Sequence, residues 1–299
     1  MTVDIRRVTS LADCDTARAI AAAVWGSDAA CSTPQMSVHA NYGGVVLLAY
    51  AGSEAVGFLF SFPALYRGEW VLWSHETAVL PEYLHQGIGS ALKLYQRTAA
   101  TELGYRSIAW TFDPLVSRNA HFNLNKLGAN VVEYKINAYG ADENDLVNQG
   151  IETDRFIALW DINAVQMIQG SGADQEGIME DRGFADQHGV PNQQDLLETH
   201  QHTILAVGSD DEPLVHIHET PARVDAGTGH MPLGHKGDPG AWGDEVFHTR
   251  IPLELPARRE TRGLWREVFR DAALSLFESG YTPLQFRRTK GYGEYIWGK

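Results

Sequence analysis

The stretches TAVLP at residues 77–81 and HQGIGSAL at residues 85–92 decide the fold of the first half of this 299-residue chain. A strand-like run from 70 to 80 enters a turn with two glycines one residue apart, and apolar residues then recur at helical steps of three and four from Ile88. The first turn of a helix carries main-chain amides without intrahelical partners, and glycine lets a ligand approach the backbone closely. A strand, a glycine turn and a helix in this order predict a binding site for an anion such as a pyrophosphate.

Two glycines alone are a weak signal, because a tight strand-to-helix turn without a ligand uses the same pattern. Other phosphate motifs fit this stretch poorly. It contains no GxxxxGK[ST] motif, and Leu92 stands where a dinucleotide fingerprint has its third glycine. The identity of the anion therefore depends on the elements around the turn.

Apolar runs and turn residues divide the rest of the first half into short elements. We expect helices at 15–25, 88–103 and 119–127, and strands at 45–50, 56–62, 70–80, 107–112, 131–136 and 155–162. The segment 166–192, rich in Gly, Asp and Gln, predicts a connection between two domains, 1–163 and 164–299.

The second half repeats part of this order. We expect a hairpin from 204–207 and 214–218, a Gly/Pro loop at 225–244, a strand at 245–251, a helix carrying Trp265 and Leu276 on its apolar face, and a strand at 284–287. That helix stops at Gly280-Tyr281, as the earlier one stops at Gly104-Tyr105, which indicates a degenerate internal duplication. The residues ARRETRG at 257–263 replace the glycine turn, so we expect no pyrophosphate site in this copy.

Composition limits the partners. The formal net charge is −14 with scattered acidic residues, which disfavours nucleic acid and membrane surfaces as partners. The N-terminal residues lack the apolar core of a signal peptide, and no apolar run approaches the roughly 20 residues of a membrane span. The two cysteines, Cys14 and Cys31, leave a disulfide open but favour a reduced, cytoplasmic protein.

Around the glycine turn, the residues AVLP at 78–81 and QGIGSAL at 86–92 resemble the coenzyme A-binding motif of the GNAT superfamily of N-acyltransferases. Downstream, Asn119-Ala120 and KLGA at 126–129 resemble the second motif of that family, a strand followed by a short helix ending in Leu-Gly. The resemblance covers residues 1–160. It implies an α/β (α+β) fold with a mixed, mostly antiparallel central sheet flanked by helices, followed here by a second, smaller GNAT-like half.

The resemblance implies an acyl-coenzyme A-dependent N-acyltransferase, with acetyl- or succinyl-coenzyme A as co-substrate and a small amine or amino acid as acceptor. The backbone of Ala78 and Val79 would pair with the pantetheine arm as an added strand. Asn119 would face the coenzyme or simply cap its helix, and Phe122 would pack near the coenzyme. The pyrophosphate would be held by amides from six residues: His85, Gln86, Gly87, Ile88, Gly89 and Ser90.

Two residues depart from the family pattern. Leu84 stands where the family usually has Arg or Gln, and Leu124 stands where a tyrosine often protonates the leaving thiolate. Coenzyme binding survives both changes because main-chain amides carry it, but the general acid is not identified; Tyr134 and Tyr139 are alternatives that nothing in the sequence places. A catalytically silent coenzyme A sensor or scaffold is therefore the alternative function.

Strand alternation predicts that Trp73 and His75 share one face of the 70–80 strand, opposite Ser74 and Glu76. The base position that is frequent in the family aligns with Trp73, which cannot accept a proton. His75 is the first candidate for the base because imidazole titrates near neutrality, and Glu76 is the second. A hydrogen-bonded structural role is the competing interpretation of His75.

Stretches outside the two motifs resemble a narrower group of GNAT-like proteins, some of which resemble amino acid N-succinyltransferases: residues 127–129, 137–140, 153–155, 265–266, Phe277 and 280–281. This resemblance implies a donor and an acceptor that both carry a carboxylate. Arg118 and Arg155 are the candidate carboxylate-binding residues, although an ordinary ion pair at a strand end also explains Arg155.

Metal binding and assembly have weaker signals. His216 and His218 share one face of a strand, with His200 and His202 nearby in sequence, but solvated histidines explain this pattern and we expect no metal. A homodimer is left open.

Overall fold

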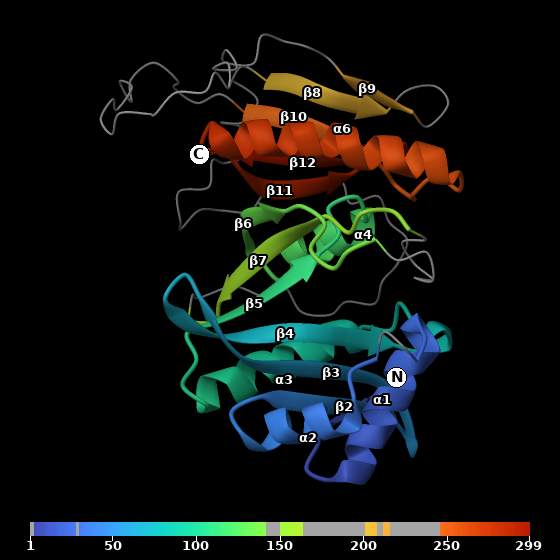
Figure 1. Ribbon diagram of the computed structural model, residues 1–299, viewed down its shortest axis with the longest axis vertical. Helices are drawn as coiled ribbons and strands as arrows, with labels where there is room; N and C mark the ends of the chain where they lie inside the picture. Colours follow the sequence, from blue (N-terminus) through green and yellow to red (C-terminus); the bar gives the residue numbers. More distant parts are fainter. Residues whose placement is uncertain (1–2, 28–29, 142–149, 164–200, 208–211, 216–245) are drawn as a thin grey trace. The chain divides into compact units, whose positions relative to one another are not determined.

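The computed structural model describes residues 3–27, 30–141, 150–163, 201–207, 212–215 and 246–299. The chain packs as two units (Figure 1). The first comprises Met1–Asp113 and Lys126–Gly177, and the second comprises Pro114–Asn125 and Ile178–Lys299. The connection predicted at 166–192 and the loop predicted at 225–244 lie outside the described residues.

A seven-stranded sheet forms the centre of the first unit, in the order β1-β2-β3-β4-β5-β7-β6. Every neighbouring pair is antiparallel except β4 and β5, which are parallel. The predicted fold class, a mixed and mostly antiparallel sheet flanked by helices, is confirmed. The strands are β1 (Asp4–Arg7), β2 (Val45–Ala51), β3 (Glu54–Tyr66), β4 (Glu69–Val79), β5 (Ser107–Phe112), β6 (Asn130–Lys135) and β7 (Arg155–Asp161).

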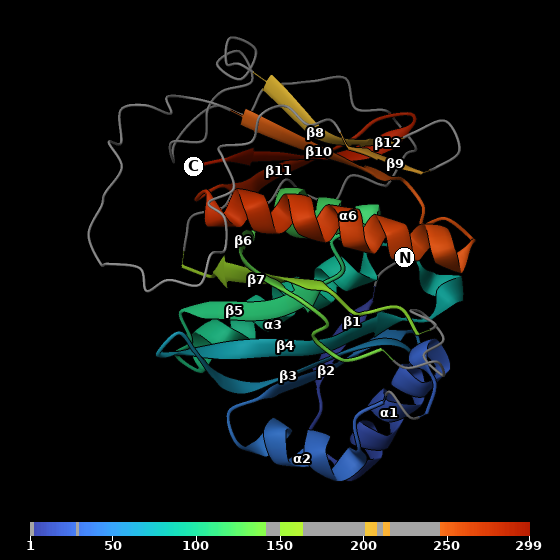
Figure 2. The same cartoon turned by 45° about the horizontal axis from the view of Figure 1, so that its top comes forward.

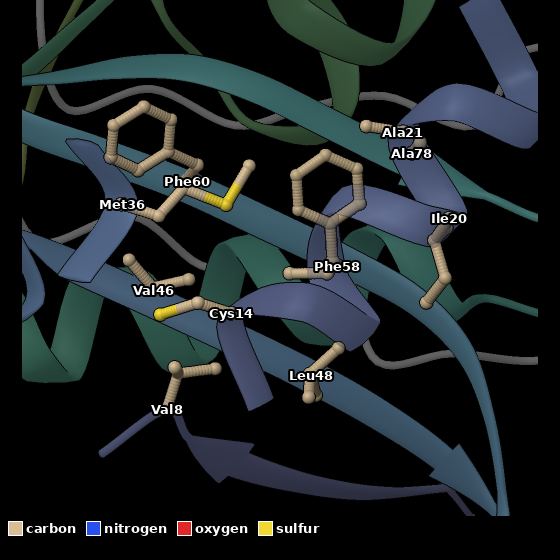
Figure 3. Packing of buried hydrophobic residues seen from close by; sticks show 11 residues of the cluster. Val8, Cys14, Ile20, Ala21, Met36, Val46, Leu48, Phe58, Phe60 and Ala78 are labelled. Atoms are coloured by element: carbon tan, nitrogen blue, oxygen red, sulfur yellow. The ribbon is translucent and has the colours of Figure 1, made fainter. Parts of the chain in front are cut away.

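Helices α1 (Leu11–Trp25) and α2 (Thr33–Asn41) pack on one face of this sheet. Figure 3 shows Cys14 of α1 and Met36 of α2 beside Phe58 and Phe60 of β3. Each fully buried aromatic or Met side chain contributes about 1.5–3 kcal/mol by leaving water. Because neighbouring residues of a strand face opposite ways, the other face of β3 and β4 is left for α3 (Ile88–Glu102).

Local capping explains where the sequence-based boundaries of the first helices were inaccurate. The Ser10 hydroxyl accepts a hydrogen bond from the Asp13 amide at 3.2 Å, so α1 begins at Leu11 rather than at residue 15. The α2 helix was not predicted. It buries only Met36, so its apolar periodicity is too weak to be read from the sequence.

A five-stranded sheet forms the second unit, in the order β11-β12-β10-β8-β9. Helix α6 (Arg259–Glu278) lies along this sheet (Figure 2) and buries Trp265, Phe269 and Leu276. The predicted hairpin is present as the antiparallel pair of β8 and β9. The strands are β8 (Gln201–Val207), β9 (Pro213–Val215), β10 (Val246–Pro252), β11 (Thr282–Arg288) and β12 (Tyr292–Gly298).

The segment 114–125 packs with the second unit although it follows β5 directly. The Tyr295 hydroxyl donates to the Pro114 carbonyl at 2.6 Å, and the Phe286 amide donates to Asn125 Oδ1 at 3.2 Å. The segment contains α4 (Ser117–Ala120), whose N-cap is Val116. Asn119 therefore lies inside the helix, and the interpretation of Asn119 as a helix cap is wrong.

The internal duplication takes a different form from the one predicted. The sequence-based alignment matched β4, α3 and β5 with β10, α6 and β11, but β12 lies between β10 and β11. Strand order and direction instead match β8-β10-β12-β11 with β4-β5-β7-β6, since each set has one parallel pair followed by two antiparallel pairs. In chain order, α6 lies between β10 and β11, and the helical segment after β5 lies between β5 and β6. Each follows the second strand of the parallel pair, so α6 corresponds to the segment after β5.

Candidate functional site

The glycine turn joins the end of β4 to α3 through a short 3₁₀ helix at Pro81–Tyr83. His85 has a φ of 61° and Gly87 a φ of 79°, so the chain reverses twice through left-handed conformations before the helix starts. Leu84, Gln86 and the turn around them are exposed, whereas Ile88 is buried and anchors the first turn of α3. The predicted loop residues therefore form an exposed turn, which the buried side chain of Ile88 holds in place.

The first amides of α3 point out of this turn without a side-chain cap. Gly87 is the N-cap and has no side chain to accept their hydrogen bonds, and the first helical turn contains no acidic residue. The first intrahelical bond runs from the Ala91 amide to the Gly87 carbonyl at 3.0 Å. The amides before Ala91 therefore have no intrahelical acceptor, and the positive end of the helix dipole lies beside them.

The space above the two glycines is open. A Cβ atom built on Gly87 or on Gly89 meets no heavy atom within 4 Å. Gly87 needs its positive φ, but Gly89 lies in the helix, where glycine is less stable than alanine by about 1 kcal/mol or less. The packing of the fold thus gives no reason for glycine at position 89, whereas close approach of a ligand to its amide does.

The central strands β4 and β5 separate next to this turn. On one edge, β4 pairs with β3 from Glu69 to Val79. On the other edge, the pairing with β5 covers only Leu72 and Trp73. Beyond Trp73, in the described part of the chain, no strand pairs with this edge of β4, so its main-chain groups are available to an extended ligand. Ala78 and Val79 lie on this free edge.

A β-bulge in β4 changes which side chains share a face. Glu76 pairs with Phe60 and Ser74 pairs with Ser61, so His75 is the additional residue of the bulged strand. The predicted alternation of these residues is therefore wrong. Ser74 faces α3, while His75 and Glu76 both lie on the α1–α2 face.

This bulge brings His75 and Glu76 together with Cys31, in the loop between α1 and α2. The nearest ligand atoms of the three side chains all lie within 4.8 Å of one another, and the Cys31 amide donates to Glu76 Oε1 at 3.3 Å. Cys31 was not among the predicted site residues, because it is separated from Glu76 by 45 positions. Cys14 and Cys31 are not joined to one another in the structure, and Cys14 is buried in the core.

Burial shifts the proton affinity of this cluster. It raises the pKa of Glu76, and the hydrogen bonds from Cys31 only partly oppose that effect. His75 packs against the rings of Phe60 and Phe62, and burial together with the charge of His39 lowers its pKa. A carboxyl with a raised pKa beside a neutral imidazole is suited to accepting a proton near neutral pH.

A second buried ionisable group lies on the opposite face of β4. Lys93 of α3 donates from Nζ to Ser74 Oγ at 2.8 Å and lies 4.1 Å from the centre of the Trp110 ring. Burial lowers its pKa to about 7. Tyr95 of the same helix, whose aromatic side chain is a more obvious core residue than lysine, is 37% exposed. Position 93 lies three residues before Gln96 and seven before Ala100, which are also buried, and the charge of lysine hid its place on this face.

The stretches 137–140 and 153–155 form one hydrogen-bonded junction. Asp154 accepts from the Tyr134 hydroxyl at 2.7 Å and from the Asn137 amide at 2.9 Å. Arg155 lies 3.6 Å from Asp113 and 5.6 Å from the Tyr139 ring centre, and the Tyr139 hydroxyl is 2.7 Å from Thr111 Oγ1. The Tyr134 hydroxyl therefore already donates to the Asp154 carboxylate, and Arg155 already forms an ion pair with Asp113.

The remaining predicted residues lie in the segment that packs with the second unit. Arg118 is exposed, and Asn119 and Phe122 are half-buried. His216, His218 and His200 lie outside the described residues, as does the side chain of His202. Among the helices described, none combines the length and the apolar character needed to span a membrane.

No protein-family model and no curated protein sequence matches the chain. Solved structures that are similar to it include the ribosomal-protein-S18-alanine N-acetyltransferase from Escherichia coli, at 15% identity and a TM-score of 0.43, covering 58% of this chain and 99% of that chain. Naa50 from Arabidopsis thaliana, solved with a bisubstrate analogue, has 15% identity and a TM-score of 0.43, covering 53% and 98%. A GNAT family acetyltransferase from Elizabethkingia anophelis with acetyl-coenzyme A bound has 17% identity and a TM-score of 0.37, covering 53% and 97%.

Proposed function

We propose that residues 1–163 form an acyl-coenzyme A-dependent N-acyltransferase domain. The observation that carries this proposal is the continuity of two features: the free edge of β4 leads directly into the uncapped glycine turn before α3. A ligand that fits both features has an extended arm with amide groups, which can pair with the edge of β4, followed by a diphosphate, which can bind at the turn. Acyl-coenzyme A has both parts in this order.

The chain would hold the coenzyme mainly through its backbone. The main chain of Ala78 and Val79 pairs with the amides of the pantetheine arm, as an added strand would. The diphosphate then meets the amides of the turn and of the first turn of α3, where Gly87 and Gly89 leave the space open. Asn119 and Phe122 stay predicted contacts of the coenzyme, to be tested by substitution.

The chemistry of transfer needs a neutral amine at the point where β4 leaves β5. Glu76, with His75 beside it, takes the proton from the acceptor ammonium. The neutral amine nitrogen then attacks the thioester carbonyl, the new C–N bond forms and the C–S bond breaks. The leaving thiolate takes up the second proton, which the nitrogen loses as it becomes an amide. Glu76 is the better-placed base because its carboxylate is buried and its raised pKa lies closer to neutral pH.

Donor and acceptor are proposed as classes. Acetyl- and succinyl-coenzyme A are the candidate donors, and a small amine or an amino acid is the candidate acceptor. A succinyl donor or an amino acid acceptor requires a cation for its carboxylate, and Arg118 and Arg155 are the candidates. Arg118 is the more available side chain, because Arg155 lies in an ion pair with Asp113 and is 14% exposed.

One observation favours the alternative of a silent coenzyme A sensor. Leu124 is 7% exposed and occupies the position at which the family resemblance puts a proton-donating tyrosine. The Tyr134 hydroxyl, an alternative proton donor to the thiolate, already donates a hydrogen bond to Asp154. A sensor needs the diphosphate site but not the acid.

Two measurements separate these functions. Isothermal titration with coenzyme A measures binding, and a free-thiol assay with acetyl- or succinyl-coenzyme A against pooled amines and amino acids measures transfer. Binding with acceptor-dependent thiol release supports the transferase. Binding without release for any acceptor supports the sensor, and the absence of binding rejects both.

A further inference from the structure

Acyl transfer gives a role to His75 and Glu76 but not to the third member of their cluster, Cys31. We propose that these three side chains form a binding site for a thiophilic divalent cation of the zinc class. The site is separate from the coenzyme contacts on the glycine turn, and the proposal does not depend on acyl transfer.

The geometry of the cluster is close to that of a formed metal site. In a tetrahedral zinc site with bonds of roughly 2.0–2.3 Å, neighbouring ligand atoms are roughly 3.5 Å apart. The corresponding atoms here lie within 4.8 Å of one another before any ion is added. A contraction of about 1 Å, within reach of side-chain rotation, is enough to close the site.

The backbone assembles this geometry from parts that would otherwise lie apart. A regular strand would direct His75 and Glu76 to opposite faces, and only the bulge in β4 brings both to the face that Cys31 approaches. Cys31 lies at the edge of the α1–α2 core. The hydrogen bond from its main-chain amide to the Glu76 carboxylate holds the loop against the strand. Bulges are frequent beside functional sites because they redirect a side chain.

Glu76 supplies a second, independent observation. Its side chain is 8% exposed, and Oε2 is buried without a hydrogen-bond partner among the described residues. A buried carboxylate oxygen without a partner is unfavourable, and a cation beside it removes the penalty. The buried ammonium of Lys93 does not serve this role, since it lies on the other face of the sheet and donates to Ser74.

The ligand types indicate the kind of metal. A thiolate, an imidazole and a carboxylate together favour zinc over magnesium or calcium, which prefer oxygen ligands alone. Three protein ligands leave a fourth position for water, and the exposed side chain of His75 provides access from solvent. Binding converts the Cys31 thiol to a thiolate and releases its proton to solvent.

A nucleophilic thiol is the rival interpretation of this cluster, and the surroundings oppose it. Burial first, and then the neighbouring charge of Glu76, raise the pKa of Cys31 to about 12. A free thiolate is therefore disfavoured, whereas a bound divalent cation reverses this balance by its own charge. The same groups cannot serve as ligands and as bases at once, so a bound metal would suppress the transfer proposed above.

Cobalt(II) titration of the metal-free, full-length protein tests the proposal, because cobalt substitutes for zinc and a thiolate–cobalt bond gives a near-ultraviolet charge-transfer band. The chain has only two cysteines, so Cys14→Ala is a matched control for Cys31→Ser. We expect one equivalent of cobalt to produce the band in the wild type and in Cys14→Ala, and zinc to abolish it by displacement. Cys31→Ser should lack the band.

His75→Gln keeps the test decisive even where Cys31→Ser does not fold, which far-ultraviolet circular dichroism shows. His75 is only partly buried and Gln is similar to it in size and polarity, so the replacement should leave the fold intact and weaken cobalt binding at least about tenfold. No thiolate band in the wild type overturns the proposal. A band that persists in Cys31→Ser, or cobalt affinity unchanged in folded His75→Gln, overturns it equally.

Discussion

The two parallel strand pairs of this chain have the same place in their sheets but different extents. In the first unit, β4 and β5 pair only at Leu72 and Trp73 and then separate. In the second unit, β8 and β10 pair from Val246 to Thr249, and the pairing continues across a register shift. The longer pairing leaves less of the strand edge free in the second sheet than in the first. We infer that the separation of the pair, rather than the strand order, makes the first unit a site.

The long helices α3 and α6 differ in their first turns, although they do not have the same place in the two sheets. No acidic residue lies in the first turn of α3, whereas α6 has Glu260 in its first turn and Arg258 as its N-cap. A carboxylate at this position occupies the positive end of the helix and repels an anion. By connection α6 corresponds to the segment after β5 rather than to α3, so the prediction that the second copy has no pyrophosphate site stays a prediction.

The largest expected effect is on kcat, and it compares two buried glutamates, Glu76 in the first sheet and Glu294 in the second. Glu76→Gln should lower kcat by about 10²–10⁴-fold, because it removes the proposed base, while coenzyme affinity stays unchanged. Burial raises the Glu76 pKa, so the charge of Glu76 reduces stability as the pH rises through that pKa, and the Gln variant should be at least as stable at neutral pH.

Glu294 of the second unit is the matched control, because it is 6% exposed and lies 2.8 Å from Arg250 Nε and 3.4 Å from His248 Nδ1. Glu294→Gln should reduce the free energy of unfolding by a few kcal/mol without changing kcat of the folded protein. Equal losses of kcat in the two variants would remove Glu76 from the reaction.

The next effect concerns the glycine turn. Gly89→Val should weaken coenzyme A binding by about 100-fold, or about 2.7 kcal/mol, because its side chain fills the space that the diphosphate needs. Gly263 of α6 also has an open surrounding, so Gly263→Val introduces the same side chain away from the site. Calorimetry should give wild-type affinity for Gly263→Val. Similar affinities for both variants would contradict the assigned position of the diphosphate.

The third effect is on the pH dependence of stability, and it compares two buried cationic side chains, Lys93 of α3 and Arg266 of α6. Lys93 has a pKa lowered from 10.5 to about 7, so between these values the unfolded chain binds a proton that the folded chain does not. The free energy of unfolding should therefore rise with pH across this range and be lowest below pH 7. Lys93→Met should flatten the rise and be the more stable protein at low pH by a few kcal/mol, as measured by urea unfolding.

Arg266 of α6, which is 5% exposed, is the comparison for Lys93. Arginine stays charged over the same pH range, so Arg266→Met should leave the slope of stability against pH unchanged. A slope that persists in Lys93→Met shows that another group titrates.

The smallest effect is on stability at position 89. Gly89→Ala should raise the free energy of unfolding by up to about 1 kcal/mol, because alanine favours the helix and its Cβ meets no neighbouring atom. Coenzyme affinity should fall in the same variant. A gain in stability without a loss of affinity would show that the glycine is not kept for the ligand.

Local patterns in the sequence were sufficient for the glycine turn and for six of the seven strands of the first sheet, whereas β1 (Asp4–Arg7) was not predicted. Ser107–Phe112 was predicted at its observed bounds, and α3 began at Ile88 as expected, because apolar periodicity and glycine act over neighbouring residues. The second copy was aligned less well, since β12 was not predicted and its insertion beside β10 depends on long-range pairing.

The chemistry of the site was less accessible from the sequence. His75 and Glu76 were named as candidates, but their shared face depends on a bulge that alternation cannot reveal. Cys31 joins them from a loop 45 residues away, and Lys93 carries a charge that made it look like a surface residue. These positions are set by tertiary packing, so only the folded chain brings them together.

The most direct test of the central claim compares coenzyme A with pantetheine, which has the extended arm but lacks the diphosphate and the phosphoadenosine joined to it. Titration of each into the wild-type protein and into Gly89→Val by calorimetry measures how much of the difference in affinity depends on the glycine turn. We predict that coenzyme A binds at least about tenfold, or 1.4 kcal/mol, more tightly than pantetheine. Equal affinities, or no binding of coenzyme A at about 1 mM, would contradict the account.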